Sequence, residues 1–144
     1  AADAAYRWAT EARGVPPGRV VLAGESLGSG PAVDLAARRD HEALVLVFPF
    51  TSLPAAARST FPFLPCETLM ANRFDNLSKI GRCRRPVFVA HGTADRVVPF
   101  AHGERVYAAA NPPKRFLPLP GFGHSIGLPD EFYRELREFL DGPR

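Results

Sequence analysis

Long apolar runs, cysteine and lysine are all scarce in this sequence. The longest apolar run extends from Ala43 to Phe50. A membrane-spanning helix needs roughly 20 apolar residues, so we expect no transmembrane segment. The two cysteines, Cys66 and Cys83, match neither zinc-site spacing nor a disulfide-rich scaffold, and they predict reduced thiols and a cytoplasmic location.

Positive charge is only slightly in excess, at a formal +3, and arginine supplies most of it because Lys79 and Lys114 are the only lysines. The densest basic cluster is Arg82, Arg84 and Arg85, which is shorter than the basic stripe of a typical nucleic-acid-binding surface. We interpret it as a solvated loop and expect no nucleic-acid partner. The 15 prolines and 12 glycines are spread along the chain, which excludes collagen-like and low-complexity sequences.

Short apolar runs alternate with segments of helical periodicity, a pattern typical of a parallel sheet joined by right-handed crossovers. Two of the runs are nearly continuous in apolar residues, as expected for strands that are covered on both faces. We therefore predict one α/β domain, with a four-stranded parallel sheet between flanking helices. The predicted strands are Arg19–Ala23, Ala43–Phe48, Pro86–His91 and Lys114–Leu119.

Helical segments precede, separate and follow these strands. Asp3 is expected to cap a first helix that ends at Gly14, and its apolar spacing is carried by Ala5, Trp8, Ala9 and Ala12. Further helices are predicted over Ser26–Arg39, over Pro99–Asn111 and from Pro129 onward. The stretch from Thr51 to Gly81 breaks the pattern, and we expect it to form irregular or helical turns over the carboxyl edge of the sheet.

The segment Gly24-Glu25-Ser26-Leu27-Gly28 is a G-x-S-x-G motif between the first predicted strand and a predicted helix. In that setting the motif is typical of a nucleophile elbow, in which a tight turn lifts the serine hydroxyl above the sheet. Side chains at either glycine position are expected to strike the neighbouring strand or helix. The Leu27 N–H is a candidate oxyanion-hole donor, because it lies at the amino end of the following helix.

Two further residues lie past the carboxyl ends of predicted strands, where open parallel sheets place their ligands. Asp95 follows the third strand in His91-Gly-Thr-Ala-Asp95, and His124 follows the fourth in Gly121-Phe-Gly-His124. A serine nucleophile needs a base to remove its proton, and that base needs a third group to fix its tautomer. The chain order serine, acid, histidine is that of a large class of hydrolases.

The remaining polar residues are assigned structural or solvated positions. His91 ends a strand before a glycine turn, where packing and backbone hydrogen bonds explain it. Asp75 and Asp130 are expected to begin helices. We expect solvent-exposed side chains at His41, His102 and Glu25, with tuning of the site as the alternative for Glu25.

Five stretches of the chain resemble the α/β-hydrolase superfamily, and together they span nearly all of it. The similarity is closest to the serine-aminopeptidase-like, α/β-hydrolase-domain branch, which includes eukaryotic protein depalmitoylases and many bacterial members. The stretches are Gly-Glu-Ser-Leu-Gly-Ser-Gly-Pro-Ala-Val-Asp-Leu-Ala from Gly24, Pro-Phe-Thr-Ser-Leu from Pro49, Arg-Phe-Asp-Asn-Leu-Ser-Lys-Ile from Arg73, His-Gly-Thr-Ala-Asp-Arg-Val-Val-Pro-Phe from His91 and Gly-Phe-Gly-His from Gly121.

This resemblance implies Ser26 as nucleophile, Asp95 as acid and His124 as base, in agreement with the inference from the residues themselves. It implies hydrolysis of an ester or thioester in a small-molecule or acylated substrate, with no metal or other cofactor. The Phe- and Leu-rich stretch 51–81 would then form the acyl-side wall of the pocket, which favours an apolar acyl group.

The front of the domain departs from the family pattern. Members of the superfamily have further strands before the nucleophile strand, and a loop among them supplies the second oxyanion-hole N–H. We therefore expect residues 1–144 to form a single partial domain, either a fragment of a longer gene product or a remnant. The missing N-terminal half is expected to pair with the strand at residues 19–23.

Two alternative functions remain open. An aminopeptidase, suggested by the same branch, needs acidic groups near the pocket to hold a substrate ammonium, and Glu25 and Glu67 are the candidates. A non-catalytic scaffold can keep the fold without the chemistry. A scaffold, however, has no need for a serine, an aspartate and a histidine in register.

Overall fold

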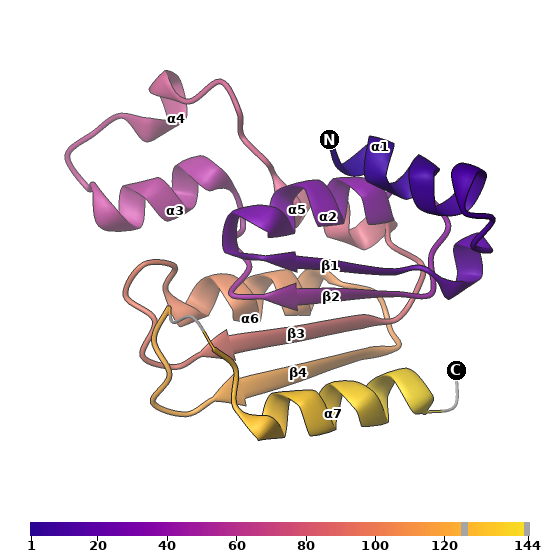
Figure 1. Cartoon of the computed structure of the whole chain (residues 1–144). Coiled ribbons are helices and arrows are strands. Elements are labelled where there is room, and N and C mark those ends of the chain that lie inside the picture. Colours follow the sequence, from indigo (N-terminus) through magenta and orange to yellow (C-terminus); the bar gives the residue numbers. More distant parts are fainter. Residues whose placement is uncertain (125–126, 143–144) are drawn as a thin grey trace.

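A computed structural model of the chain describes residues 1–124 and 127–142, apart from the side chains of Thr60, Glu67 and Leu69. Four parallel strands form one sheet in the order β1-β2-β3-β4 (Figure 1). The predicted α/β fold class is confirmed. The strands are β1 Val21–Glu25, β2 Ala43–Val47, β3 Val87–Gly92 and β4 Lys114–Leu119.

β1 begins and ends two residues later than predicted. Pro17–Arg19 forms a 3-10 turn before it, and pairing with β2 starts only where Val21 lies beside Ala43. As a result Gly24 and Glu25 belong to the strand, and Ser26 is the first residue beyond it.

The crossover helices cover one face of the sheet. Because the strand order moves in one direction and crossovers are right-handed, each crossover returns over the same face. The helices packed there are α2 Ser29–Ala36, α5 Asn76–Lys79 and α6 Phe100–Ala109, together with Tyr6 from α1 Ala2–Arg7. α7 Asp130–Asp141 covers the opposite face over β3 and β4, where Phe132 packs against Phe88 (Figure 1).

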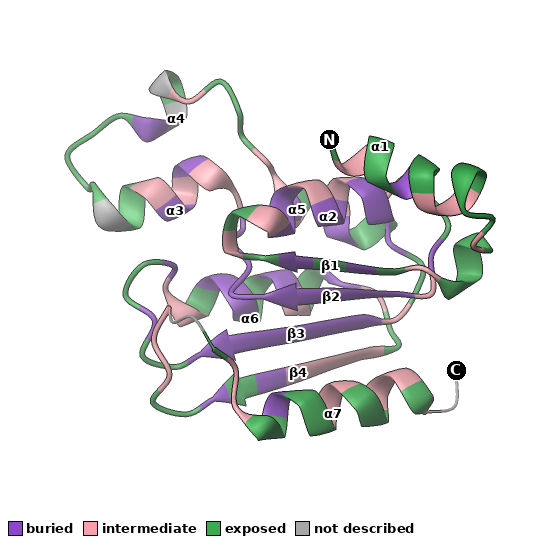
Figure 2. Ribbon diagram, in the orientation of Figure 1, coloured by how far each residue is buried: buried purple, intermediate pink, exposed green. Residues whose placement is uncertain are grey.

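Burial differs sharply between the central strands and β1. Every residue of β2 and β3 is buried, whereas β1 exposes Val21, Ala23 and Glu25 (Figure 2). Among the described residues β1 pairs with β2 alone, so it is an edge strand.

The N-terminal helical segment differs from the prediction in two respects. Asp3 lies inside the first turn of α1 instead of capping it. Trp8–Ala12 forms a π-helical turn, η1, whose longer hydrogen-bonded rings change the phase of the side chains. Tyr6 is buried, whereas Trp8, two positions further along and so on the opposite side of the helix, is 61% exposed. Ala5 and Ala12 are exposed as well, so the predicted apolar face is wrong at Ala5, Trp8 and Ala12. Gly14, with φ 68°, ends the segment as predicted.

Between β2 and β3 the chain forms three short helices and a 3-10 turn. Two of the helices make a lobe, the α3–α4 lobe (residues 53–69), which projects beyond the carboxyl ends of the strands (Figure 1). Asp75 caps the third helix as predicted, because its Oδ1 accepts a hydrogen bond from the Ser78 N–H at 3.1 Å. The elements are α3 Leu53–Thr60, α4 Cys66–Leu69, α5 and η4 Ile80–Arg82.

Cys66 and Cys83 are both free and buried, as predicted for reduced thiols. The cytoplasmic location inferred from them stays a prediction. Within the described part of the chain, no helix combines the length and the apolar character needed to cross a membrane.

Candidate functional site

The turn between β1 and α2 sets an unusual backbone conformation at Ser26. Its φ of 49° lies in the left-handed region, which is rare for residues other than glycine and clusters at functional sites. Gly24 has to be glycine, because a Cβ there would lie 2.4 Å from the Gly28 carbonyl oxygen and 2.7 Å from the Ala32 Cβ. The prediction that a side chain would clash is wrong for Gly28, since a Cβ there would meet no described atom within 4 Å. Gly28 faces an open apolar groove beside β1.

Three side chains that are distant in sequence form a hydrogen-bonded series. His124 Nε2 lies 2.9 Å from Ser26 Oγ, across 98 positions of the chain. His124 Nδ1 lies 2.8 Å from Asp95 Oδ2. An ionised carboxylate only accepts hydrogen bonds, so Nδ1 donates to it and Nε2 is left to accept the serine proton.

The Asp95 carboxylate is buried and its oxygens have defined partners. The side chain has no exposed surface. Oδ1 accepts hydrogen bonds from the backbone N–H groups of Val97 and Val98, both at 2.9 Å. Oδ2 faces His124 and also lies 3.3 Å from His91 Nε2. The turn that follows β3 thereby fixes the orientation of the acid toward His124.

His91 stands behind the acid and does not face Ser26. Its Nε2 lies 2.8 Å from the Val98 carbonyl oxygen, to which it can only donate. Its buried Nδ1 has no hydrogen-bond partner among the described residues, and Gly103 lies so close that a Cβ there would be 2.4 Å from it. Burial lowers the pKa of His91, so the ring is neutral. These contacts agree with the structural role predicted from the sequence.

A buried polar network holds the turn at Ser26, and the sequence analysis did not predict it. Ser29 Oγ donates to the Ser26 carbonyl oxygen at 2.7 Å. Asn76 Nδ2 donates to Ser29 Oγ at 3.1 Å and to the Phe50 carbonyl oxygen at 2.9 Å. Ser29 and Asn76 are both almost fully buried, at 0% and 1% exposure. Only the three-dimensional structure brings them together, because 47 positions separate them in the chain.

An apolar cleft of about 180 Å³ opens beside Ser26. One wall comes from α3, through Leu53, Ala56 and Ala57. None of its lining residues is charged. The complete lining is Ser26, Leu27, Phe50, Leu53, Ala56, Ala57, Val97 and Val98.

Leu27 lies in the 3-10 turn Ser26–Gly28 that leads directly into α2. Its backbone N–H is at the amino end of this helical segment, where the peptide dipoles favour a negative charge. The side chain is 56% exposed and lines the cleft. The oxyanion-hole role of the Leu27 N–H stays a prediction.

Two histidines that the sequence assigned to solvent are buried. His41 is 1% exposed, with Nδ1 2.9 Å from the Arg39 carbonyl oxygen. His102 is 8% exposed, with Nδ1 3.0 Å from Thr51 Oγ1. Burial lowers the pKa of both rings. The prediction failed because neighbouring segments cover these two helix-end and helix-face positions.

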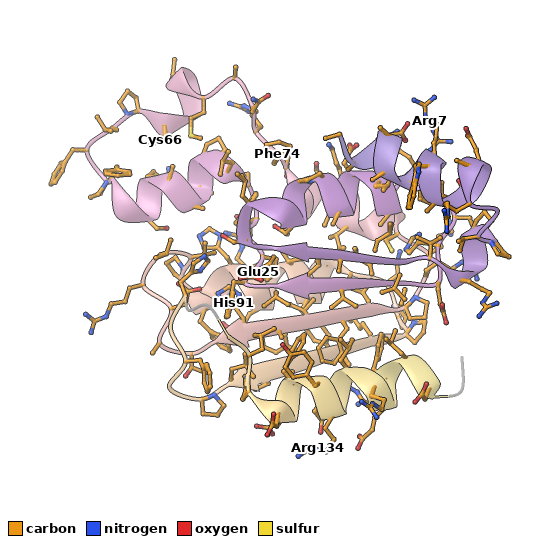
Figure 3. All side chains as sticks on the ribbon, viewed as in Figure 1. Arg7, Glu25, Cys66, Phe74, His91 and Arg134 are labelled. Carbon is orange, nitrogen blue, oxygen red and sulfur yellow. The ribbon has the colours of Figure 1, made fainter. Side chains whose placement is uncertain are left out.

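Of the two acidic candidates for an ammonium site, Glu25 does not line the cleft. Glu25 is exposed at the end of β1, as expected (Figure 3). The Glu67 side chain lies outside the described residues. Among the described residues, no group of three or more histidine, cysteine or acidic side chains is arranged to hold a metal ion.

Comparison with known proteins finds relatives along most of the chain, although no family model matches it. An uncharacterized protein of Mycobacterium tuberculosis is 40% identical over 124 residues, which cover 86% of this chain and 44% of that protein. Human alpha/beta hydrolase domain-containing protein 17B is 34% identical over 128 residues, which cover 88% of this chain and 43% of that protein. The chain therefore spans somewhat less than half the length of these curated relatives.

Solved structures share the fold at lower sequence identity. The monoacylglycerol lipase of Paleococcus ferrophilus superposes with a TM-score of 0.68 at 21% identity, over 95% of this chain and 72% of that chain. A puromycin-hydrolyzing peptidase of Mycobacterium tuberculosis superposes with a TM-score of 0.72 at 23% identity, over 95% of this chain and 23% of that chain. A lipase and a peptidase are thus both similar to the chain in fold.

Proposed function

Since the chain belongs to the α/β-hydrolase superfamily, we propose that the protein containing it is a serine hydrolase that cleaves an ester or thioester. The observation that carries the proposal is the hydrogen-bonded series Ser26–His124–Asp95 at the carboxyl edge of the sheet. The left-handed φ of Ser26 supports it, because such conformations are held in place at functional sites. A scaffold with the same fold has no need of this arrangement.

The proposed reaction proceeds through an acyl-enzyme. His124 takes the Ser26 proton while Oγ attacks the carbonyl carbon, and buried Asp95 stabilises the resulting imidazolium. The oxyanion of the tetrahedral intermediate accepts a hydrogen bond from the Leu27 N–H. His124 then gives the proton to the leaving group. Water repeats the sequence on the acyl-enzyme and releases the acid and free Ser26.

The substrate proposal rests on the cleft beside Ser26. Its walls are apolar, which favours an acyl chain of short to medium length. An aminopeptidase needs a carboxylate to hold the substrate ammonium, and no acidic side chain among the described residues lines the cleft. The peptidase alternative keeps support from the fold shared with the puromycin-hydrolyzing enzyme, so the substrate comparison in the Discussion separates the two.

We propose that residues 1–144 are one part of a larger domain. The relatives are about twice as long as the chain. Among the described residues β1 pairs with β2 alone, so its other edge is unpaired. A further strand beside β1 would pair its free backbone groups and cover the groove next to Gly28. The same region of the full protein would supply the second oxyanion-hole donor next to Leu27.

A fluorophosphonate probe tests the proposal directly, because it forms a covalent bond only with an activated serine. We expect the full-length protein to be labelled at Ser26 and the Ser26→Ala variant to remain unlabelled. The variant Ser59→Ala is a suitable control, since the Ser59 hydroxyl also lies near a histidine, 3.5 Å from a ring nitrogen of His102, but does not line the cleft. Labelling that persists in Ser26→Ala would contradict the assignment, and an unlabelled parent protein would favour the scaffold.

A further inference from the structure

Large apolar side chains gather at the tip of the α3–α4 lobe. Phe61, Phe63 and Leu64 are 55%, 97% and 51% exposed, although single exposed apolar residues are the ordinary case. Three within four positions make a patch of the kind that marks an interaction site. Pro62 and Pro65 interrupt the connection and restrict its backbone, so little conformational freedom remains to be lost on binding.

The tip of the lobe points away from the sheet, and behind it α4 packs against α3. Figure 1 shows the connection between α3 and α4 at the far end of the lobe, away from the sheet, and Figure 2 shows that it is exposed. Cys66 is buried in α4 and lies between α4 and α3 (Figure 3). The tip therefore projects as a convex apolar surface and is not folded back onto the protein.

Arginine side chains lie at the base of the lobe, where α3 begins. A pocket of about 270 Å³ is lined by Arg58, Arg73 and Arg105, with Asp75 as its one acidic member. The Asp75 carboxylate already accepts a hydrogen bond from the Ser78 N–H as a helix cap. Arg58 connects the two features, because it lines the pocket and precedes Phe61 by about one helical turn.

Apolar side chains at a tip with cations at its base match the interface of a membrane that contains anionic lipid. We propose that the α3–α4 lobe docks on such a surface, with Phe61, Phe63 and Leu64 among the acyl chains. Arg58 and Arg105 then contact the lipid phosphates. A convex apolar tip suits a lipid layer, which has no fixed shape of its own, better than a preformed protein groove.

Docking in this way has a consequence for the cleft. Successive faces of α3 line the basic pocket through Pro54 and Arg58 and the Ser26 cleft through Ala56 and Ala57. The helix that leads to the docking tip is therefore also a wall of the cleft. The docking itself does not depend on the proposed hydrolase function.

Co-sedimentation of the full-length protein with vesicles tests the proposal without any assay of catalysis. We expect binding to vesicles of phosphatidylcholine mixed with phosphatidylglycerol, and weaker binding to phosphatidylcholine alone. Phe63→Ser should weaken binding at least about tenfold, because the membrane no longer buries an aromatic ring. Arg58→Ala should weaken binding to the anionic vesicles alone by about fivefold.

Matched variants on α7 provide the controls. Tyr133 is 55% exposed and Arg137 is also exposed, and both lie on the helix that covers the opposite face of the sheet. Tyr133→Ser and Arg137→Ala should bind like the parent, and thermal unfolding should show that every variant is folded. Failure of the parent to bind anionic vesicles, or unchanged binding by Phe63→Ser, would overturn the proposal and leave the tip as a protein-contact surface. Equal binding to both vesicle types would overturn the role of the arginines.

Discussion

His91 and His124 share one oxygen atom of Asp95: Nε2 of His91 lies 3.3 Å from Oδ2, and Nδ1 of His124 lies 2.8 Å from it. The two rings are not equivalent, because the His91 Nε2 proton is directed to the Val98 carbonyl oxygen at 2.8 Å. Asp95 is therefore oriented by the backbone N–H groups of Val97 and Val98 at Oδ1, and its Oδ2 accepts the hydrogen bond of His124.

The first prediction concerns His124, which faces Ser26, and Asp95, which lies behind His124. His124→Ala should lower kcat by roughly 10³-fold or more, because it removes the base that lies 2.9 Å from Ser26 Oγ. Asp95→Asn should cost about 10⁴-fold, since an amide no longer fixes the imidazole tautomer. Hydrolysis of a p-nitrophenyl ester measures both. Asp75→Asn, an equally conservative change at a helix cap, should leave kcat near the parental value, and a triad variant with parental kcat would refute its assigned role.

The second prediction compares the two glycines of the elbow. Gly24→Ala should lower the free energy of unfolding by about 1–3 kcal/mol or more, because the new methyl group overlaps backbone atoms of the following helical turn. Gly28→Ala should be neutral or stabilising by up to about 1 kcal/mol in the 144-residue chain, since its φ of −63° is helical and the space is open. Urea unfolding of both variants measures the difference. Equal destabilisation would show that the elbow is packed differently.

The third prediction concerns pH. Burial lowers the pKa of His41, His91 and His102 in the folded state, whereas in the unfolded chain they titrate near 6.5. Below about pH 6.5 the unfolded state binds more protons, so stability is complete above that pH and falls as the pH is lowered toward the native pKa values. Each histidine contributes a slope of at most about 1.4 kcal/mol per pH unit.

His41→Asn isolates one of these contributions. Asparagine keeps a donor toward the Arg39 carbonyl oxygen but does not titrate. The variant should lose less unfolding free energy than the parent between neutral and mildly acidic pH, as measured by urea denaturation. A variant with the parent's full acid sensitivity would show that the destabilising protons bind elsewhere.

The fourth prediction concerns substrate class. Acyl esters and thioesters should have higher kcat/KM than aminoacyl amides, because the described lining of the cleft offers apolar contacts and contains no carboxylate for an ammonium group. Ala57→Asp places an acid in the cleft wall and should narrow the difference. Faster turnover of the amides by the parent would favour the aminopeptidase instead.

The sequence was sufficient to predict the sheet and the proximity of Ser26, Asp95 and His124, because parallel strands impose long apolar runs and place polar residues at their carboxyl ends. It was insufficient where the burial of a side chain depends on another segment that packs over it. His102 lies on a helix face that Thr51 covers. In the first helix the chain buries the face of Tyr6, and not the predicted face of Ala5 and Trp8. The Ser29–Asn76 contact joins α2 and α5 through one hydrogen bond, and such a contact leaves no periodic pattern in the sequence.

The last prediction concerns the two edges of the sheet, which are protected very differently. The outer strand β4 carries Lys114, Arg115 and Pro118, which are residues that discourage edge-to-edge pairing. β1 has only Glu25 as a charged residue, and it exposes Val21 and Ala23 beside the apolar groove.

The isolated 144-residue chain should therefore self-associate through β1, whereas the full-length protein should be monodisperse and at least about 10²-fold more active because it regains a second oxyanion donor. Size-exclusion chromatography and ester hydrolysis compare the two proteins. Ala23→Lys should suppress self-association of the short chain, because it places a charge on the free edge, while Tyr133→Lys adds the same charge on α7 and should not. Gly28→Ala adds an independent test: a strand lying in the groove would turn a harmless methyl group into a clash, so the substitution should destabilise only the full-length protein. A monodisperse short chain with full activity would show that β1 needs no further strand.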